Sequence, residues 1–475
     1  MYDSKLIHIL RHLSNKQLKL LEDFIASPYF NKKEEIIHFC TFLMRFKPLF
    51  QDARMSKKAA YQHILPHQPY NEKKMSYWMS DFTKLIEQFL VVENINSQPI
   101  RKLSYLTRTY LQLNLYKLVQ STLKTTTKQQ RKNPLRDADF YFNQFMIHRD
   151  ENLFFDRQNL HLYDDSLQKA IDNLDIYYLS RKLKYCCEMV SRQNIVASQY
   201  ELRMLDEILL YLKKNPHNDI PPIAIYSTIL LTLLEAKEEK HFVHLKDLLK
   251  QYNAVFPKSD AYTIYMYAIN YCIKQVNGGN ETYLNDLFQL YQELLKTEII
   301  FENKKEISPW AFTNIVGVGV RNKAYDWTEN FIADYKNNLP IHFRKSVYSY
   351  NLSYLFFYQK KYTEAQSLLQ HIEFDTVLYS INARSLLLRI YYELDELDAF
   401  LSLVDSFKMY LKRNKLISQN RKEQYLKFVK YTAKLHKTPR TAKAKLRILK
   451  EELAANRNTA NASWLLEKIE ERLNR

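Results

Sequence analysis

Residues 347–372 read VYSYNLSYLFFYQKKYTEAQSLLQHI and predict two antiparallel helices joined by a short turn. The first helix covers residues 347–358 and is rich in aromatic side chains, and residues 359–361 form the turn. In the second helix, apolar residues recur at offsets of 0, 3, 6, 7 and 10, the spacing of one face of an α-helix. These residues are Tyr362, Ala365, Leu368, Leu369 and Ile372. The stretch therefore predicts a helix pair with an apolar face to bury.

The same pattern occurs on both sides of this stretch. One copy precedes it at residues 312–335, and another follows it at residues 380–411. The equivalent residues Tyr325, Tyr362 and Leu397 are 37 and 35 positions apart. A nearly constant period of this length is typical of stacked helical repeats. The alternative is a non-repetitive helical bundle in which the period arises by chance.

The opening of the second helix, Tyr362-Thr363-Glu364-Ala365, resembles the tetratricopeptide repeat, in which an aromatic residue followed by x-x-Ala begins that helix. Pro340 stands where that family has a proline between repeats. The resemblance covers residues 308–411 and implies an all-α, right-handed solenoid of antiparallel helix pairs. Thr328 and Phe400 depart from the pattern because they occupy the family's small-residue position, so close helix packing is not implied there.

A solenoid of this kind presents a concave groove lined by the first helix of each pair. In the clearest copy the groove residues would be Tyr350, Tyr354 and Phe357. A peptide or a partner helix fits such a groove. We therefore expect a non-enzymatic helical-repeat scaffold that mediates protein–protein interaction.

Composition argues against the common nucleotide-dependent enzymes. The chain has only 4 glycines among 475 residues, and it contains no phosphate-binding Gly-x-x-x-x-Gly-Lys-Ser/Thr loop. Val316-Gly317-Val318-Gly319 lies inside a predicted repeat helix, where small residues let helices approach, and lacks the third glycine of a dinucleotide fingerprint. No serine elbow or kinase loop is present. We therefore expect no enzymatic activity and no cofactor.

The spacing of the cysteines and histidines is unfavourable for a metal site and for disulfide bonds. Cys40, Cys186, Cys187 and Cys272 lack Cys-x-x-Cys spacing and read as reduced core residues. The pairs His8 and His12, and His241 and His244, each put two imidazoles on one helix face, whereas zinc needs three or four ligands. We expect no metal site. The absence of a signal-peptide pattern and of a membrane span favours a cytoplasmic protein.

Residues 1–95 predict a separate N-terminal helical module. Ser14 and Gln17 form a capping box, and residues 72–92 predict a long helix with a broad apolar stripe. Residues 13–18 and 27–32 are similar to the start of an uncharacterised bacterial family of helical-repeat proteins. The alternative is a DNA-reading helix-turn-helix centred on residues 66–71, but that connection is longer than the motif uses. Residues 96–305 then predict an irregular helical-repeat region, and residues 306–475 the repeats with basic helices and a capping helix.

The net charge of +18 is concentrated in two stretches. Residues 94–136 contain nine Lys and Arg and no acid, and residues 406–450 contain fifteen with one acid, Glu423. Pro439 predicts a helix start, and on that helix Arg440, Lys443 and Arg447 share a face. The densest basic residues are Lys434, Lys437, Arg440, Lys443, Lys445, Arg447 and Lys450. The alternative function is therefore a nucleic-acid-associated regulator that uses this C-terminal patch, and the competing interpretation is a solvated helix face.

The last predicted helix, residues 461–475, is amphipathic and suits the end of a solenoid. Leu465, Ile469 and Leu473 would face the core. The outward face would carry Glu467, Lys468, Glu470, Glu471 and Arg472.

Overall fold

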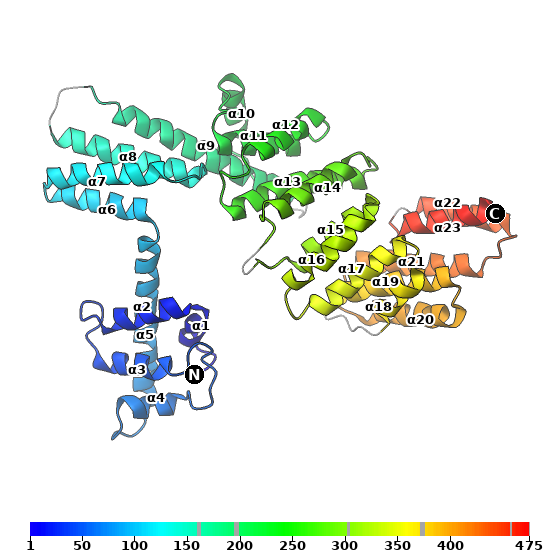
Figure 1. Ribbon diagram of the computed structural model, residues 1–475, viewed down its shortest axis with the longest axis horizontal. Coiled ribbons are helices and arrows are strands. Elements are labelled where there is room, and N and C mark those ends of the chain that lie inside the picture. The colour runs from blue at the N-terminus through cyan, green and yellow to red at the C-terminus, as the bar shows by residue number, and fades with distance from the viewer. Residues whose placement is uncertain (159–162, 194–198, 302–304, 371–375, 457, 475) are drawn as a thin grey trace. The chain divides into compact units, whose positions relative to one another are not determined.

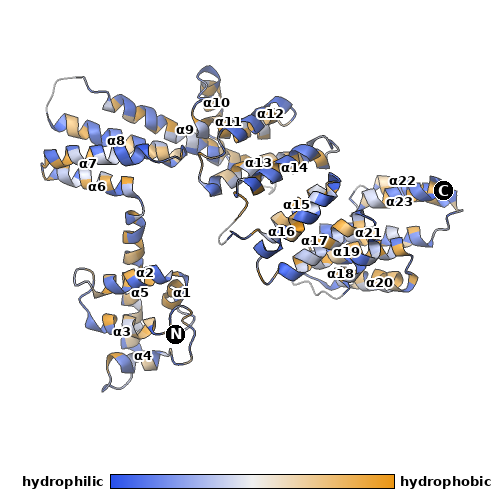
Figure 2. Ribbon diagram, viewed as in Figure 1, coloured by the Kyte–Doolittle hydropathy of each residue, from blue (hydrophilic) through white to orange (hydrophobic). Residues whose placement is uncertain are grey.

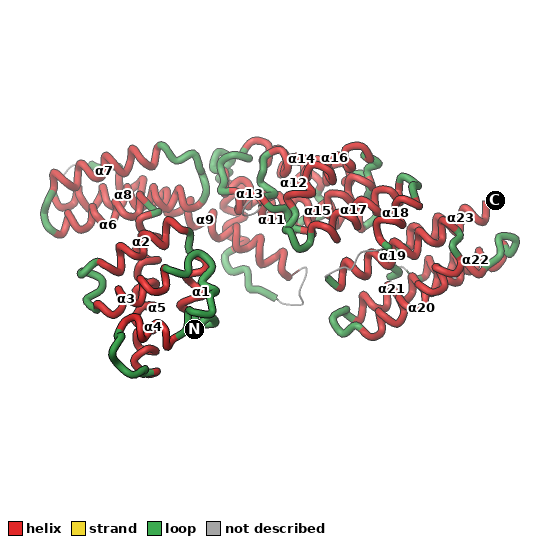
Figure 3. Tube along the Cα trace, turned by 60° about the horizontal axis from the view of Figure 1, so that its bottom comes forward, coloured by secondary structure: helices red, strands yellow, loops and turns green. Residues whose placement is uncertain are grey.

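The computed structural model describes residues 1–158, 163–193, 199–301, 305–370, 376–456 and 458–474. Throughout these residues the regular elements are helices, and no β-strand occurs (Figure 3). Neighbouring helices along the chain pack against each other, as in the pairs formed by residues 99–131, 258–296 and 344–369. The prediction of an all-α protein built from consecutive helix pairs is thus confirmed. Ile372, the last residue of the predicted stripe, lies outside the described residues.

The chain forms two compact units. The first consists of Met1–Cys186 with Leu202–Ala224, and the second of Cys187–Glu201 with Ile225–Arg475. The boundaries expected at residues 95 and 305 both lie inside these units. Two helices continue from one unit into the other along the chain, α9 (Ser166–Gln193) and α11 (Pro221–Leu234).

The first five helices share one hydrophobic cluster. They are α1 (Lys5–His12), α2 (Asn15–Ala26), α3 (Glu34–Met44), α4 (Lys57–Ile64) and α5 (Glu72–Asn96) (Figure 1). The predicted capping box is present, since Ser14 accepts from the Gln17 N–H and the Gln17 side chain accepts from the Ser14 N–H. The α5 stripe faces this cluster, with Trp78, Phe82 and Ile86 fully buried. This burial agrees with the prediction that the stripe belongs to a hydrophobic core.

The remaining helices complete the two units. The first unit continues with α6 (Pro99–Gln112), α7 (Tyr116–Arg131), α8 (Ala138–Arg157), the first part of α9 and α10 (Leu205–Lys214). The second unit contains α12 (Glu239–Gln251), α13 (Lys258–Asn277), α14 (Tyr283–Lys296), α15 (Pro309–Arg321), α16 (Tyr325–Tyr335), α17 (Arg344–Tyr358), α18 (Tyr362–Leu369), α19 (Val377–Leu394), α20 (Leu397–Arg413), α21 (Gln419–Lys437), α22 (Lys443–Ala455) and α23 (Ala462–Asn474). Most helices carry both hydrophilic and hydrophobic residues, as expected for helices that bury one face (Figure 2).

One turn geometry recurs at the predicted period. Lys323, Lys360 and Asp395 adopt left-handed φ angles of 58°, 62° and 59°, each two residues before the second helix of a pair. The residue that follows donates its N–H back five positions, as from Lys361 to the Phe356 carbonyl at 2.9 Å. This bond satisfies a carbonyl at the helix end, as in the Schellman motif. Asn114 makes the same turn between α6 and α7, with φ of 58°.

The small-residue position of the repeat is occupied by Thr328, Ala365 and Phe400. Close helix packing is present at the first two of these residues. Ser353 of α17 donates to the Ala365 carbonyl of α18 at 2.8 Å. Thr328 is fully buried, and a Cβ atom added to Gly319 would overlap its Oγ1. The glycine of α15 therefore makes room for the larger residue of α16, which the repeat pattern alone did not indicate. A Cβ at Gly317 would meet nothing within 4 Å.

In the last helix, α23, the predicted inward face is confirmed in part and the predicted outward face is partly wrong. Leu465 and Ile469 are fully buried in α23, as predicted. Lys468, expected on the outward face, is buried instead, and Arg472 donates to the carbonyls of Leu435 and Thr438 at 2.7 and 2.9 Å. Both cations point inward because carboxylate and carbonyl oxygens of neighbouring helices lie within hydrogen-bonding distance of them.

Candidate functional site

The three residues predicted to line the groove lie on α17 with different exposures. Tyr350 and Phe357 are buried, with 7% and 5% of their surfaces exposed, and Tyr354 is partly exposed. The Tyr350 ring packs edge-on against Tyr379 of α19 at 5.7 Å, and the Tyr354 ring lies 5.0 Å from Tyr358. Two of the three rings therefore contribute to packing between first helices, and Tyr354 is the one that reaches the surface.

The same helices enclose a buried cation, Arg389, that was not among the residues predicted from the sequence. Arg389 of α19 is only 4% exposed, and its guanidinium lies 4.6 Å from the centre of the Phe357 ring. It makes no hydrogen bond or ion pair with any residue that the structure describes, and its Nε is buried without a partner. The only feature of the sequence that could have indicated a buried charge is the position of Arg389 between Leu388 and Ile390, which are both fully buried.

A buried guanidinium without a counter-charge is energetically costly. Removing an ion from water costs several kcal/mol even after the protein relaxes. A cation–π contact such as the one with Phe357 returns only about 1–2 kcal/mol. Arginine also carries five N–H donors in a planar fork that matches carboxylate and phosphate groups. Arg389 therefore has no counter-charge among the residues that the structure describes, and its planar fork of donors matches a carboxylate or phosphate group.

Tyrosines from two other helices surround this charge. Burial raises the pKa of Tyr350 and of Tyr354 in α17, and the positive charge of Arg389 opposes that rise in both. Burial also raises the pKa of Tyr425 in α21, which Arg389 again lowers in part. These phenols therefore stay protonated at neutral pH, and the Tyr425 hydroxyl donates to Asn382 Oδ1 at 2.9 Å.

A polar network extends from this site to α15. Asn351 is buried and donates to the Val347 carbonyl at 2.8 Å and to Thr313 Oγ1 at 3.1 Å. Thr313 is also hydrogen-bonded to Tyr379 at 2.7 Å. We call these residues and those around the guanidinium the Arg389 cluster, which consists of Thr313, Tyr350, Asn351, Tyr354, Phe357, Tyr379, Arg389 and Tyr425. The Oδ1 atom of Asn351 is buried without a donor, a second unsatisfied group in the cluster.

The seven predicted basic residues divide into two groups. Three are engaged within the unit: Lys434 pairs with Glu452 at 2.8 Å, Lys450 pairs with Glu470 at 2.9 Å, and Lys443 donates to the carbonyls of Arg472 and Leu473. These contacts join α21 to α22 and α22 to α23. The other four, which form no such contact in the described chain, are exposed: Lys437, Arg440, Lys445 and Arg447. The expected shared face that included Arg440 is wrong, because α22 begins at Lys443 and Arg440 precedes it.

The histidine pairs and cysteines have ordinary packing partners. His12 bonds to the His8 carbonyl at 2.8 Å, and His241 contacts Glu235 at 2.7 Å. All four cysteines are free and buried. Among the described residues, no three side chains of the types His, Cys, Asp and Glu gather as a metal site.

No family model, curated protein or solved structure matches this chain. The site must therefore be interpreted from its own geometry. Within the described ranges, none of the helices is long and apolar enough to cross a membrane.

Proposed function

We propose that this chain is a non-enzymatic helical-repeat scaffold that binds an acidic segment of a partner protein at the Arg389 cluster. The observation that carries the proposal is the buried side chain of Arg389, which has no ion-pair partner among the described residues and whose Nε is buried without an acceptor. A carboxylate from the partner would accept two parallel N–H bonds from Arg389, which is the strongest neutral-pH contact that this side chain makes. The Tyr350 hydroxyl would add a donor beside the same carboxylate.

The architecture proposed for this region is a right-handed, tetratricopeptide-like solenoid. The left-handed turn residues recur 37 and 35 positions apart, and close packing occurs at Ala365 and Thr328. In such a solenoid the first helices line the concave face. The Arg389 cluster draws its residues from α15, α17, α19 and α21, the helices that would occupy that face.

The test compares two arginines of α19 in the full-length chain. Peptides selected from a random library with free C-termini would be labelled and measured by fluorescence anisotropy. Arg389→Met keeps the side-chain length and removes the charge, and we expect it to weaken binding at least tenfold. Arg389→Lys keeps a positive charge but lacks the planar fork of donors, so we expect a loss of affinity smaller than that of Arg389→Met. Arg384→Met is the control, because Arg384 is partly exposed and stacks on Tyr410.

The stability of the same variants separates a binding role from a structural one. Removing an uncompensated buried charge is neutral or stabilising. We therefore expect Arg389→Met to unfold at the same or a higher urea concentration than the parent. If Arg389→Met instead lowers stability by more than about 2 kcal/mol and the selected peptides still bind, Arg389 is a packing residue. Loss of binding on amidation of the C-terminus or on removal of one acidic side chain would identify the carboxylate involved.

A further inference from the structure

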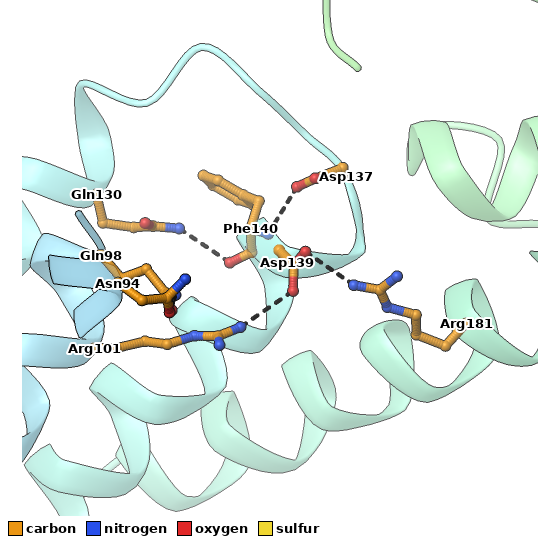
Figure 4. Close-up of polar contacts among 8 residues, drawn as sticks. All are labelled: Asn94, Gln98, Arg101, Gln130, Asp137, Asp139, Phe140 and Arg181. Atoms are coloured by element: carbon orange, nitrogen blue, oxygen red, sulfur yellow. Dashed lines mark hydrogen bonds and ion pairs between the residues drawn. The ribbon is translucent and has the colours of Figure 1, made fainter. Parts of the chain in front are cut away.

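A second candidate site lies in the first unit, where the ends of three helices meet. The first turn of α6, the last turn of α7 and the first turn of α8 surround a pocket of about 650 Å³. This volume is in the range of small-molecule sites. Figure 4 shows the polar side chains around it, including Gln130 of α7, Arg101 of α6 and Asp139 of α8.

Two amide oxygens of the pocket wall are buried without a donor. Gln130 is 1% exposed, and its Nε2 donates to the Phe140 carbonyl at 3.0 Å, which fixes the orientation of the amide. Its Oε1 receives no hydrogen bond, and neither does the buried Oδ1 of Asn143. An unsatisfied buried acceptor costs about 1–3 kcal/mol. Two in one pocket therefore indicate a ligand that brings hydrogen-bond donors.

The charged groups of the pocket favour a negative group on the same ligand. Asp139 accepts from Arg101 at 3.3 Å and from Arg181 at 2.9 Å, so two guanidiniums share one carboxylate. Lys132 is exposed and forms no ion pair within the described chain. The local charge is therefore positive. A neighbouring hollow is lined by Lys124, Lys128 and Arg131, with Glu151 as its one acidic residue, so the positive region extends along α7.

The helix ends themselves present both signs of partial charge. The first turn of α6 has no side-chain cap, and the Gln98 amide donates to Asn94 Oδ1 at 2.7 Å. The last turn of α7 contributes Gln129 and Gln130 and carries the opposite partial charge. A helix N-terminus binds an anion, and a helix C-terminus favours a cation.

We infer that this pocket binds a small zwitterion, an α-amino acid. Its ammonium group would donate to Gln130 Oε1 and Asn143 Oδ1 beside the C-terminal turn of α7. Its carboxylate would lie against Lys132, Arg101 and the first turn of α6. The inference does not depend on the Arg389 cluster, which belongs to the other unit.

Calorimetric titration of the full-length chain with each proteinogenic L-amino acid tests this inference. We expect saturable binding of at least one amino acid below millimolar concentration. Its N-acetyl derivative lacks the ammonium group and its carboxamide lacks the carboxylate, so each should bind at least tenfold more weakly. Equal binding of either derivative would overturn the inference, as would the absence of binding by any amino acid.

Variants locate the binding within the pocket. Asn143→Leu removes an acceptor at nearly constant volume, and Lys132→Ala removes an exposed charge, so each should weaken binding about tenfold. Lys117→Ala is the matched control, because Lys117 is an exposed lysine of α7 that does not line the pocket. Circular dichroism melting of each variant verifies that the unit remains folded. Unchanged affinity in both pocket variants would contradict the assignment.

Discussion

The Lys468 ammonium lies 3.1 Å from the Glu393 carboxylate, and both side chains are largely buried, with 10% and 13% exposed. Trp464 Nε1 donates to the same carboxylate at 3.0 Å, so α23 is joined to α19 by two polar contacts. Burial lowers the pKa of Lys468, but the hydrogen bonds and charges of Glu471 and Glu393 outweigh it, and the pKa is raised overall. The lysine therefore remains charged and holds the last helix in place.

Replacing Lys468 with Met should lower the free energy of unfolding by about 3 kcal/mol, because Glu393 would be left buried without a counter-charge. Lys450→Met is the matched control. Its partner Glu470 is about half exposed, so a loss below about 1 kcal/mol is expected. Urea unfolding of the full chain measures both. Equal losses in the two variants would show that burial of the Lys468 pair contributes nothing.

The two glycines of α15 should respond in opposite ways to alanine. At Gly319 the new Cβ would overlap Thr328 Oγ1, and overpacking of this kind costs about 1–3 kcal/mol. At Gly317 the Cβ meets nothing, so the better helix propensity of alanine should stabilise the protein by up to about 1 kcal/mol. Thermal melts of the two variants test this. The idea fails if Gly319→Ala melts at or above the temperature of Gly317→Ala.

Alkaline pH should destabilise the protein through its buried tyrosines. Burial raises the pKa of Tyr265 in α13 to about 12, with a smaller contribution from Glu293. Between pH 10 and 12 the unfolded chain loses this proton while the folded chain retains it, so stability falls as pH rises. Relative to a Tyr265→Phe variant, the parent should lose roughly 2 kcal/mol over this window. Urea titrations at several pH values measure the difference, and parallel curves for the two proteins would contradict the prediction.

The basic C-terminal residues offer a direct test of the alternative function. The triple variant Arg440→Glu, Lys445→Glu and Arg447→Glu changes exposed side chains only, so its stability should match the parent. If the chain binds nucleic acid there, anisotropy with labelled duplex and single-stranded DNA should show affinity that falls steeply with salt and is lost in this variant.

Lys443→Glu is compared with the triple variant because Lys443 contacts backbone carbonyls of α23. That change sets a carboxylate against the Arg472 and Leu473 carbonyls and should lower stability instead. Binding that is absent near physiological salt, or that the triple variant retains, would leave these side chains as a solvated surface.

Local sequence patterns determined much of the fold. The capping box at Ser14, the start of α18 at Tyr362 and the spacing of the left-handed turns all depend on residues within one or two helical turns of each other. The buried stripe of α5 follows from periodicity for the same reason. Such signals are visible in sequence because the interactions behind them are local.

Tertiary packing alone decided which polar groups are buried and what they face. Periodicity predicts a surface position for Lys468, yet the carboxylate that pairs with it lies 75 positions earlier at Glu393. Arg389 likewise belongs to an ordinary helical segment, and only the packing of α17, α19 and α21 shows that no described residue pairs with it. The pocket at Gln130 requires three helix ends to meet. Periodicity specifies which face of a helix turns inward, but the partner of a buried charge is supplied by another helix, so only the packed structure reveals it.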